Sequence, residues 1–490
     1  MLFNSTEYLI FLPIVVCLFW LCPFKYRTAL LLLASYVFYM TWRPIYGLLM
    51  MGLTIANYFI GLTMSNSPSQ GKARKRFLVT GIWLNVLALC FFKYAYFCRD
   101  SANSVLALVH CQLPKIPFDI ILPLGISFFV FEFIHYLVDV YRGSAPVKNF
   151  LEFALFPSFF PTQIAGPIKR YQDFCPQLKK PQKLTVQEFD TGIELLLFGL
   201  FKKVIVGDGI GMLVTRFFAH PELLTSVDAW LACYAFAFQV YFDFSGYTDI
   251  ARGSAQLMGF KVPLNFNLPF LSQSFAEYWK RWHISLGMWL KDYVYIPLGG
   301  SRGGRFCAER NLFLTMLIAG VWHGAAMHYV VWGAYQGLAL SLHKEWRHWA
   351  DNVSFLKKIA ESKPFKPFAI LLTFNTFVFG MAMFRSETID TGLKMTQKLL
   401  FLSPPPVGLN AFNLTLPSLS GSAIYPMLPL ILIILAIGQI LADRFPGPIN
   451  GIAPIPPRLR FVRPVYLAAM ACALMAFSPD IAPQFVYFQF

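Results

Sequence analysis

Two histidines in residues 274–328 could carry acid–base chemistry. His323 lies late in the apolar run LFLTMLIAGVWHGAAMHYVVW, between Trp322 and Gly324. An ionisable side chain in such a run is costly to bury and is by default a candidate for function. A neutral imidazole can take a proton from a hydroxyl group, and burial favours the neutral form. The run therefore predicts a catalytic base at His323, with a histidine that only bonds a neighbouring helix as the structural alternative.

The second histidine, His283, lies in a more basic setting. It follows Trp282 and has Lys280, Arg281 and Lys291 nearby in the sequence. In that position it could orient an acyl thioester or a second substrate. A histidine at the start of an interfacial helix, without a chemical role, is the alternative.

A basic glycine-rich turn, GGSRGGR at residues 299–305, follows this histidine. Together with Lys291, the cations Arg302 and Arg305 could hold the phosphates of a nucleotide-bearing donor such as coenzyme A. The turn does not match the GxxxxGK[ST] pattern of ATP-binding loops, and a solvated basic loop is the simpler alternative. The cysteines show no CxxC spacing and there is no HExxH motif, so we expect no metal site.

The composition indicates that these residues lie within a membrane protein, whose helices position them. The chain is 57% hydrophobic and 13% charged, whereas soluble domains are roughly 25% charged. Many apolar runs are about as long as a helix that crosses a bilayer. The net charge of +16 falls in short clusters between these runs, which favours the positive-inside bias over a nucleic-acid partner. We expect an all-α integral membrane protein of about 11–12 transmembrane helices. The expected spans are residues 8–23, 28–41, 45–64, 77–97, 118–140, 190–215, 228–244, 311–327, 329–343, 367–385, 425–442 and 464–479.

Charge also predicts the sidedness of the spans. The densest early basic cluster consists of Lys72, Arg74, Lys75 and Arg76. The positive-inside bias places this cluster in the cytoplasm, which leaves the amino terminus on the outside. The first apolar run lacks the basic start and the cleavage site of a signal peptide, so we expect it to remain as a span.

We expect one polytopic membrane domain over residues 1–490, with three distinctive segments. Residues 150–167 are apolar but interrupted by prolines, which predicts a re-entrant segment without a straight helix. Residues 242–328 form the predicted catalytic core. The aromatic tail FVYFQF, residues 485–490, falls on the extracytoplasmic side of this topology.

Long motifs extend the pattern beyond the core. RWHISLGMWLKDYVYIPLGG and NLFLTMLIAGVWHGA, with IAGPIKRYQDF and QVYFDFSGYTDIARGSAQLMGF before them, resemble the membrane-bound O-acyltransferase (MBOAT) family. More narrowly, they resemble its bacterial branch of polysaccharide O-acetylases. The resemblance implies helices around a central funnel or tunnel. It also implies that His323 is the essential embedded histidine, that His283 is the recurrent histidine of the WHxS motif, and that Tyr487 carries the acyl group.

The same resemblance implies a function. An acetyl group would pass from acetyl-CoA, or from the thioester of an acyl-carrier protein, across the bacterial inner membrane, with no permanently bound cofactor. A periplasmic acetyltransferase partner would move it to an exported polysaccharide. Alginate is the first choice because its motifs look most similar, and peptidoglycan and cellulose stay open. Membrane lipid is a further expected partner, and no nucleic acid is expected.

Two other functions remain open on the sequence. A transporter or flippase would use the polar residues of 243–281 to line a substrate path, although no inverted repeat supports it. A family member that acylates a lipid or a protein directly would carry the same histidines.

Overall fold

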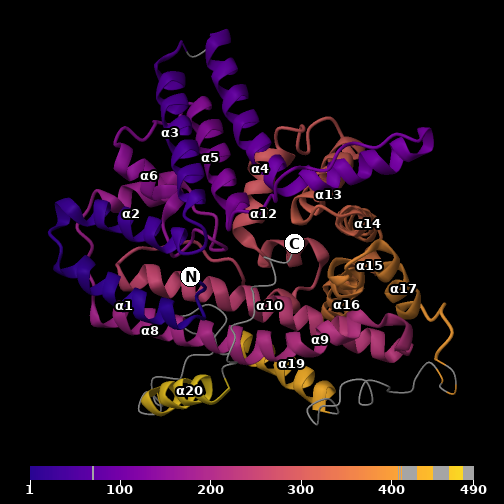
Figure 1. The fold of residues 1–490 in the computed structure, drawn as a ribbon. Helices are drawn as coiled ribbons and strands as arrows, with labels where there is room; N and C mark the ends of the chain where they lie inside the picture. Colours follow the sequence, from indigo (N-terminus) through magenta and orange to yellow (C-terminus); the bar gives the residue numbers. More distant parts are fainter. Residues whose placement is uncertain (69–70, 407, 409, 411–426, 445–462, 478–490) are drawn as a thin grey trace. The chain divides into compact units, whose positions relative to one another are not determined.

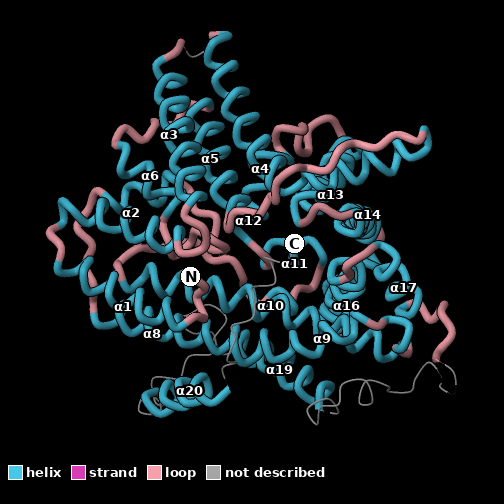
Figure 2. The backbone as a smooth tube through the Cα atoms, viewed as in Figure 1, coloured by secondary structure: helices cyan, strands magenta, loops and turns pink. Residues whose placement is uncertain are grey.

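The structure of the protein is a computed structural model, and the residues it describes are 1–68, 71–406, 408, 410, 427–444 and 463–477. Every regular element in these residues is a helix, and irregular loops join them (Figure 2). The expected all-α fold is therefore confirmed. The helices group into two compact units, one of residues 1–196 with 247–263 and one of residues 197–246 with 264–490.

The first unit holds the amino-terminal helices (Figure 1). Its elements are α1 (Thr6–Leu21), α2 (Phe24–Met40), α3 (Ile45–Asn66), α4 (Lys72–Leu106), η1 (Ala107–Val109), α5 (Ile126–Tyr141), α6 (Phe150–Ser158), α7 (Tyr171–Leu178) and most of α8 (Val186–Leu200). The long helix α10 (Ser226–Leu257) contributes its carboxyl-terminal part to this unit and its first part to the other.

The second unit holds both histidines singled out by the sequence. Besides the start of α10, its elements are the π-helix η2 (Phe201–Asp208), α9 (Gly209–Ala219), η3 (Pro221–Leu223), η4 (Pro269–Leu271), α11 (Phe275–Arg281), α12 (Ile284–Leu290), the π-helix η5 (Lys291–Tyr295), α13 (Arg305–His323), α14 (Met327–Asn352), α15 (Ser354–Glu361), α16 (Phe365–Arg385), α17 (Ile389–Leu399), α19 (Leu428–Arg444) and α20 (Arg463–Phe477).

Each segment expected to cross the membrane overlaps a helix, but several boundaries were wrong, and two of them show why. The span expected at 118–140 becomes helical only at Ile126, because Pro123 lacks a backbone N–H and interrupts the start of the run. The span expected at 228–244 continues as α10 to Leu257. Its later turns carry Asp243 and Asp249, which lower hydropathy without breaking a helix.

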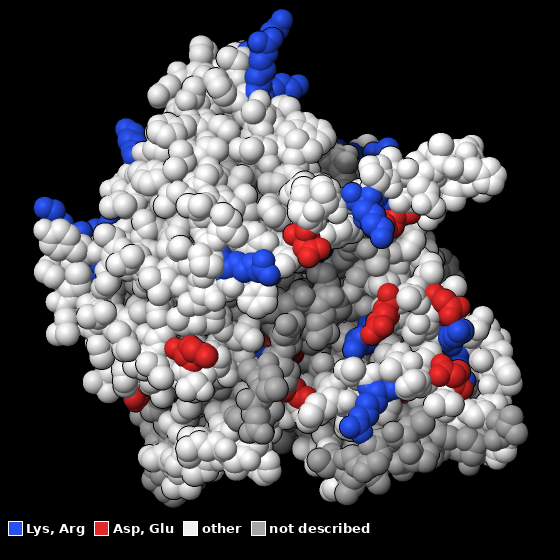
Figure 3. All heavy atoms as spheres, in the orientation of Figure 1, with Lys and Arg blue, Asp and Glu red and all other residues white. Residues whose placement is uncertain are grey.

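Among the residues that the structure describes, three helical segments are long and apolar enough to cross a membrane: α3, residues 72–109 that begin with α4, and α16. Helix α1 and residues 464–477 are apolar but shorter. On the face drawn in Figure 3, charged side chains occupy scattered places on a mostly uncharged surface. Such a surface suits contact with lipid.

The proline-rich segment 150–167 contains no continuous helix, as expected. Helix α6 starts after Asn149, whose side chain accepts hydrogen bonds from two backbone N–H groups, and it ends at Ser158. Buried turns follow through Gly166. Gly125 lies against these turns with a φ of 68°, and a Cβ atom there would be 2.4 Å from the carbonyl oxygen of Gln163. The placement of this segment as re-entrant stays a prediction.

Helices α13 and α14 form a tight hairpin (Figure 1), in which α13 ends at His323 and α14 begins at Met327. Gly320 and Gly333 meet where the two backbones cross. A Cβ atom on Gly320 would lie 2.4 Å from the carbonyl oxygen of Tyr329 and 2.7 Å from the Cα of Gly333. Glycine is needed at this crossing because no side chain fits between the backbones.

We expect Gly320→Ala to lower the stability of the protein in detergent by about 1–3 kcal/mol, because the added methyl group forces the two helices apart. Thermal unfolding would measure the loss. Gly438→Ala in α19 is the matched control, since no atom lies within 4 Å of a Cβ atom there. This control should unfold at the wild-type temperature or slightly above it. Equal unfolding temperatures for Gly320→Ala and the wild type would contradict the close crossing.

Candidate active site

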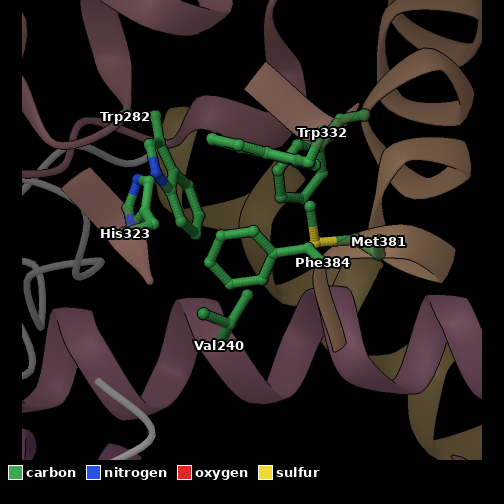
Figure 4. Close-up of a pocket in the computed structure, with 7 residues that line it drawn as sticks. Val240, Trp282, His323, Trp332, Met381 and Phe384 are labelled. Carbon is green, nitrogen blue, oxygen red and sulfur yellow. The ribbon is translucent and has the colours of Figure 1, made fainter. Parts of the chain in front are cut away.

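His323 lines a small cavity in the second unit (Figure 4). The cavity has a volume of about 10 Å³, close to the minimum that holds one water molecule. Its other walls come from α10, α14, α16 and the residue after α11: Val240, Trp282, Trp332, Phe377, Met381 and Phe384. The imidazole is 6% exposed. Its ring centre lies 5.0 Å from that of Trp332 and 5.2 Å from that of Phe384, both nearly perpendicular to it.

The end of α13 sets the position of this imidazole. His323 is the last residue of the helix, and extended backbone at Gly324 turns the chain toward α14. A Cβ atom on Gly324 would lie 2.1 Å from the ring of Tyr329, so the turn closes directly onto that ring. The negative end of the helix dipole at His323 favours the imidazolium that forms when the ring accepts a proton. Local structure therefore suits a proton acceptor.

A much larger cavity of about 700 Å³ lies among α11, α12, η5, α13 and α14. This volume is within the range of small-molecule sites. Four of its lining residues are cations and none is acidic: Lys280, Lys291, Lys344 and Arg347. Its apolar wall includes Ala276, Trp279, Met288, Leu290, Leu312, Met316 and Leu340. The cavity can therefore take a ligand with anionic groups and an apolar part.

Comparison with known proteins connects these two cavities to a family. The family model described as MBOAT, membrane-bound O-acyltransferase, matches residues 140–383, which include both His283 and His323. A probable alginate O-acetylase, AlgI of Pseudomonas aeruginosa, is 41% identical over 418 residues, or 85% of this chain and 78% of the relative. The chain belongs to the membrane-bound O-acyltransferase family. It is therefore an O-acyltransferase and a multi-pass membrane protein.

Two further relatives of this MBOAT are named for other acceptor polymers. A peptidoglycan O-acetyltransferase of Helicobacter pylori is 35% identical over 412 residues, covering 78% of this chain and 74% of the relative. A teichoic acid D-alanyltransferase of Bacillus subtilis is 30% identical over 299 residues, covering 57% of this chain and 73% of the relative. The three relatives are named for the acylation of alginate, peptidoglycan and teichoic acid. Family membership favours acyl transfer over the transporter hypothesis.

In the structure of this MBOAT, His283 does not line the small cavity. Its side chain is 1% exposed and its ring centre lies 4.7 Å from that of Phe244. Burial lowers the pKa of His283 to about 3, so the ring is neutral near pH 7. The neighbouring Trp282 lines the cavity in its place. The predicted role of His283 in orienting a substrate stays a prediction.

An unusual backbone turn separates these two neighbours. His283 has a φ of 43°, in the left-handed region that residues other than glycine rarely adopt. Asn265 supports the turn: its backbone oxygen accepts from Ile284 N at 2.9 Å, and its Oδ1 accepts from Ser285 Oγ at 2.6 Å. Sequence reasoning gave Asn265 no such role, because it lies 18 residues before the turn that it holds.

The predicted phosphate-binding cations separate into two groups. Lys291 lines the large cavity. Arg302 and Arg305 are exposed and do not line it. Arg305 Nε instead donates to Glu345 Oε1 at 2.6 Å. Lys344 and Arg347 were missed, although their spacing of three residues places them on one face of α14. The roles predicted for Arg302 and Arg305 stay predictions.

The remaining predicted site residue, Tyr487, lies outside the described residues, as does the whole tail of residues 485–490. The core predicted at 242–328 does contain Trp282 and His323 from the small cavity. It omits the walls from α14 and α16. No group of three or more His, Cys, Asp or Glu side chains suited to a metal ion occurs in the described part of the chain.

Proposed function

We propose that this protein transfers an acetyl group from a cytoplasmic thioester donor to hydroxyl groups destined for an exported bacterial cell-surface polysaccharide. The observation that carries the proposal is His323, an imidazole buried in a narrow aromatic cavity within an O-acyltransferase. The names of the relatives support a polysaccharide as the final acceptor, with alginate as the first choice and peptidoglycan as the next. Cellulose is the third candidate.

The size of the small cavity supports acetyl as the acyl group. Bulky side chains leave about 10 Å³ beside the imidazole. A long acyl chain would have to displace several packed aromatic rings, which is costly in a dense protein interior. A two-carbon group requires far less rearrangement.

The large cavity is the proposed site of the donor, acetyl-CoA or an acetylated carrier protein. Its four cations can neutralise phosphate groups, and its apolar wall can contact the pantetheine arm. One wall residue, Met316, lies seven residues before His323 on α13. Seven residues are about two helical turns, or about 10 Å, and bring the two residues close to one face of the helix. The donor needs to extend only that far to reach the imidazole.

The proposed reaction transfers one proton and one acyl group. His323 accepts the proton of the acceptor hydroxyl as its oxygen attacks the thioester carbonyl carbon. The C–S bond then breaks, and the imidazolium returns the proton to the sulfur of the departing thiol. The first acceptor is the hydroxyl of Tyr487 or of an external molecule. In the first case, a periplasmic acetyltransferase takes the acetyl group from Tyr487 and passes it to the polysaccharide. This route places the protein in the bacterial inner membrane.

Labelled acetyl-CoA added to the purified protein in lipid nanodiscs tests the proposal. We expect one acetyl adduct on the intact protein by mass spectrometry, mapped to the carboxyl-terminal peptide and missing in Tyr487→Phe. An unmodified protein that still acetylates an added soluble acceptor would favour direct transfer. If neither acetyl-CoA nor an acetylated carrier protein yields any acetyl ester, the proposed function is wrong.

A change of charge in the large cavity should weaken donor binding. We expect Lys344→Gln to raise the KM for acetyl-CoA about tenfold with little change in kcat, because a charged contact to phosphate contributes about 1.5 kcal/mol. Lys357→Gln on α15 is the control, since this lysine is exposed and does not line the cavity. Steady-state kinetics would measure both variants. A KM effect that appears in Arg305→Gln but not in Lys344→Gln would move the phosphate site to the glycine-rich turn.

A further inference from the structure

The proposed reaction places negative charge on the oxygen of the thioester carbonyl. An O-acyltransferase needs a hydrogen-bond donor for that oxygen, fixed in place before the reaction. Among the seven residues that line the small cavity, only His323, Trp282 and Trp332 have a polar side-chain atom. Since His323 is the proposed base, one of the two indole N–H groups is the candidate donor.

The indole of Trp332 differs from an ordinary core side chain. The residue is 3% exposed, and its Nε1 is buried without a hydrogen-bond partner in the described part of the protein. Most buried donors in folded proteins are paired, so an orphaned N–H beside a reactive group calls for an explanation. A substrate oxygen that arrives only with the donor would supply the missing partner.

The position of Trp332 suits such an oxygen. Its ring centre lies 5.0 Å from that of His323 at an angle of 90°, and 4.9 Å from that of Phe384 (Figure 4). Its ring centre also lies 6.2 Å from that of Trp279, which lines the large cavity. Trp332 is therefore a neighbour both of a wall residue of the proposed donor cavity and of the proposed base.

The helix that carries Trp332 is also firmly placed. Gly333, the next residue, lies against Gly320 of α13. A Cβ atom added to Gly333 would lie 2.7 Å from the carbonyl oxygen of Met316. His323 lies less than one turn beyond Gly320 on the same helix. The crossing therefore holds the indole and the imidazole in one arrangement, as a preorganised site requires.

We propose that the indole N–H of Trp332 is a catalytic hydrogen-bond donor that binds the carbonyl oxygen of the acyl thioester. This inference rests on the proposed function, because it requires a thioester donor beside His323. As the acceptor oxygen attacks, the C=O double bond becomes a C–O⁻ single bond that the N–H stabilises. When the C–S bond breaks, the electron pair returns and the carbonyl re-forms. The proton moves only between the acceptor, His323 and the thiol.

A pair of unreactive donor analogues tests this contact without turnover. Acetonyl-CoA keeps a carbonyl group but has a CH₂ group between it and the sulfur, so there is no acyl C–S bond to break, and S-ethyl-CoA has no carbonyl. We expect the wild type to bind acetonyl-CoA about tenfold more tightly, as one hydrogen bond predicts, and Trp332→Phe to bind the two analogues equally. Isothermal titration of the protein in nanodiscs would measure both affinities. In turnover, Trp332→Phe should lose about 10²–10³-fold in kcat, because the bond strengthens as charge develops on the oxygen, and its KM for acetyl-CoA should rise by up to about tenfold.

Two further variants separate the hydrogen bond from packing. Benzothienylalanine placed at position 332 replaces only the N–H with sulfur, and it should reproduce the loss even if Trp332→Phe unfolds. Trp349→Phe, on an exposed face of the same helix, should keep the wild-type preference and kcat. A carbonyl preference that survives both changes at position 332 would overturn the inference. Failure of the wild type to bind either analogue would reject the CoA donor of the proposed function, and the inference with it.

Discussion

Replacing His323 with alanine should lower the rate of acetyl transfer by about 10²–10⁴-fold, the usual contribution of a general base. The physical reason is that the acceptor hydroxyl then has no group to take its proton within a cavity of about 10 Å³. Donor affinity should change little, because none of the four cations of the large cavity is altered. Labelled acetyl transfer and binding of S-ethyl-CoA, measured on one preparation, would report both quantities.

His323→Gln and His343→Gln form a useful pair of variants. Glutamine at position 323 keeps hydrogen-bonding atoms but cannot accept a proton at neutral pH, so we expect a loss close to that of alanine. His343 lines the large cavity and is absent from the small one, so its substitution should alter KM more than kcat. A rate within threefold of wild type in His323→Ala would exclude this imidazole as the base.

His283 should behave differently from His323 as pH changes. Burial lowers the pKa of His283 to about 3, so this ring is uncharged from well below pH 6 upward and does not titrate between pH 6 and 8. A dependence of kcat on pH within that window must therefore arise from another group. The role of His283 is better tested by substituting it and measuring the KM for the donor, together with the position of the neighbouring Trp282 side chain.

The sequence predicted those features of the fold that depend on local signals. Apolar runs located the helices because the transfer of apolar side chains from water depends on composition over about 20 residues. The break in residues 150–167 followed from its prolines. His323 was recognisable because one ionisable residue interrupts an apolar run. These conclusions needed no knowledge of which helices meet.

Features that depend on contacts between distant segments could not be predicted. Phe384, on α16, lies 5.2 Å from His323 although 61 residues separate them. Arg305 is paired with Glu345, on α14, a contact that the sequence around Arg305 does not indicate. Lys344 lines the large cavity only because α14 packs back against α13. A charged residue is either a free binding group or a paired one according to its neighbours in space.

The polar segment 243–281 shows the same limit. A transporter would use its polar residues to line a substrate path. Trp279 and Lys280 do line the large cavity, whereas Asp243 is 1% exposed and its Oδ1 lies 2.7 Å from the Nζ of Lys203. Lys203 also contacts Asp208. Lys203 and Asp208 are the third and eighth residues of η2, five positions apart. An i to i+5 pair comes close on a π-helix, whose wider turn brings residue i+5 back toward residue i.

This buried triad leads to the second large expected effect. Lys203→Met should destabilise the protein by about 3–5 kcal/mol, because it removes the cation that contacts two buried carboxylates. All three side chains of the triad are at most 7% exposed, so water cannot replace the lysine. Unfolding in a series of detergent mixtures of increasing SDS content would measure the change.

Two comparisons decide whether the missing charge is the cause. Lys394→Met removes a cation from the pair with Asp390 on α17, whose side chains are 52% and 70% exposed, and it should leave stability unchanged within error. Asp208→Asn and Asp243→Asn added to Lys203→Met remove the two uncompensated charges, and together they should restore most of the lost stability. If the triple variant is as unstable as Lys203→Met alone, the loss comes from packing at position 203. Recovery in the triple variant would instead show that the ion contacts of Lys203 stabilise the packing of the π-helix η2 against α10.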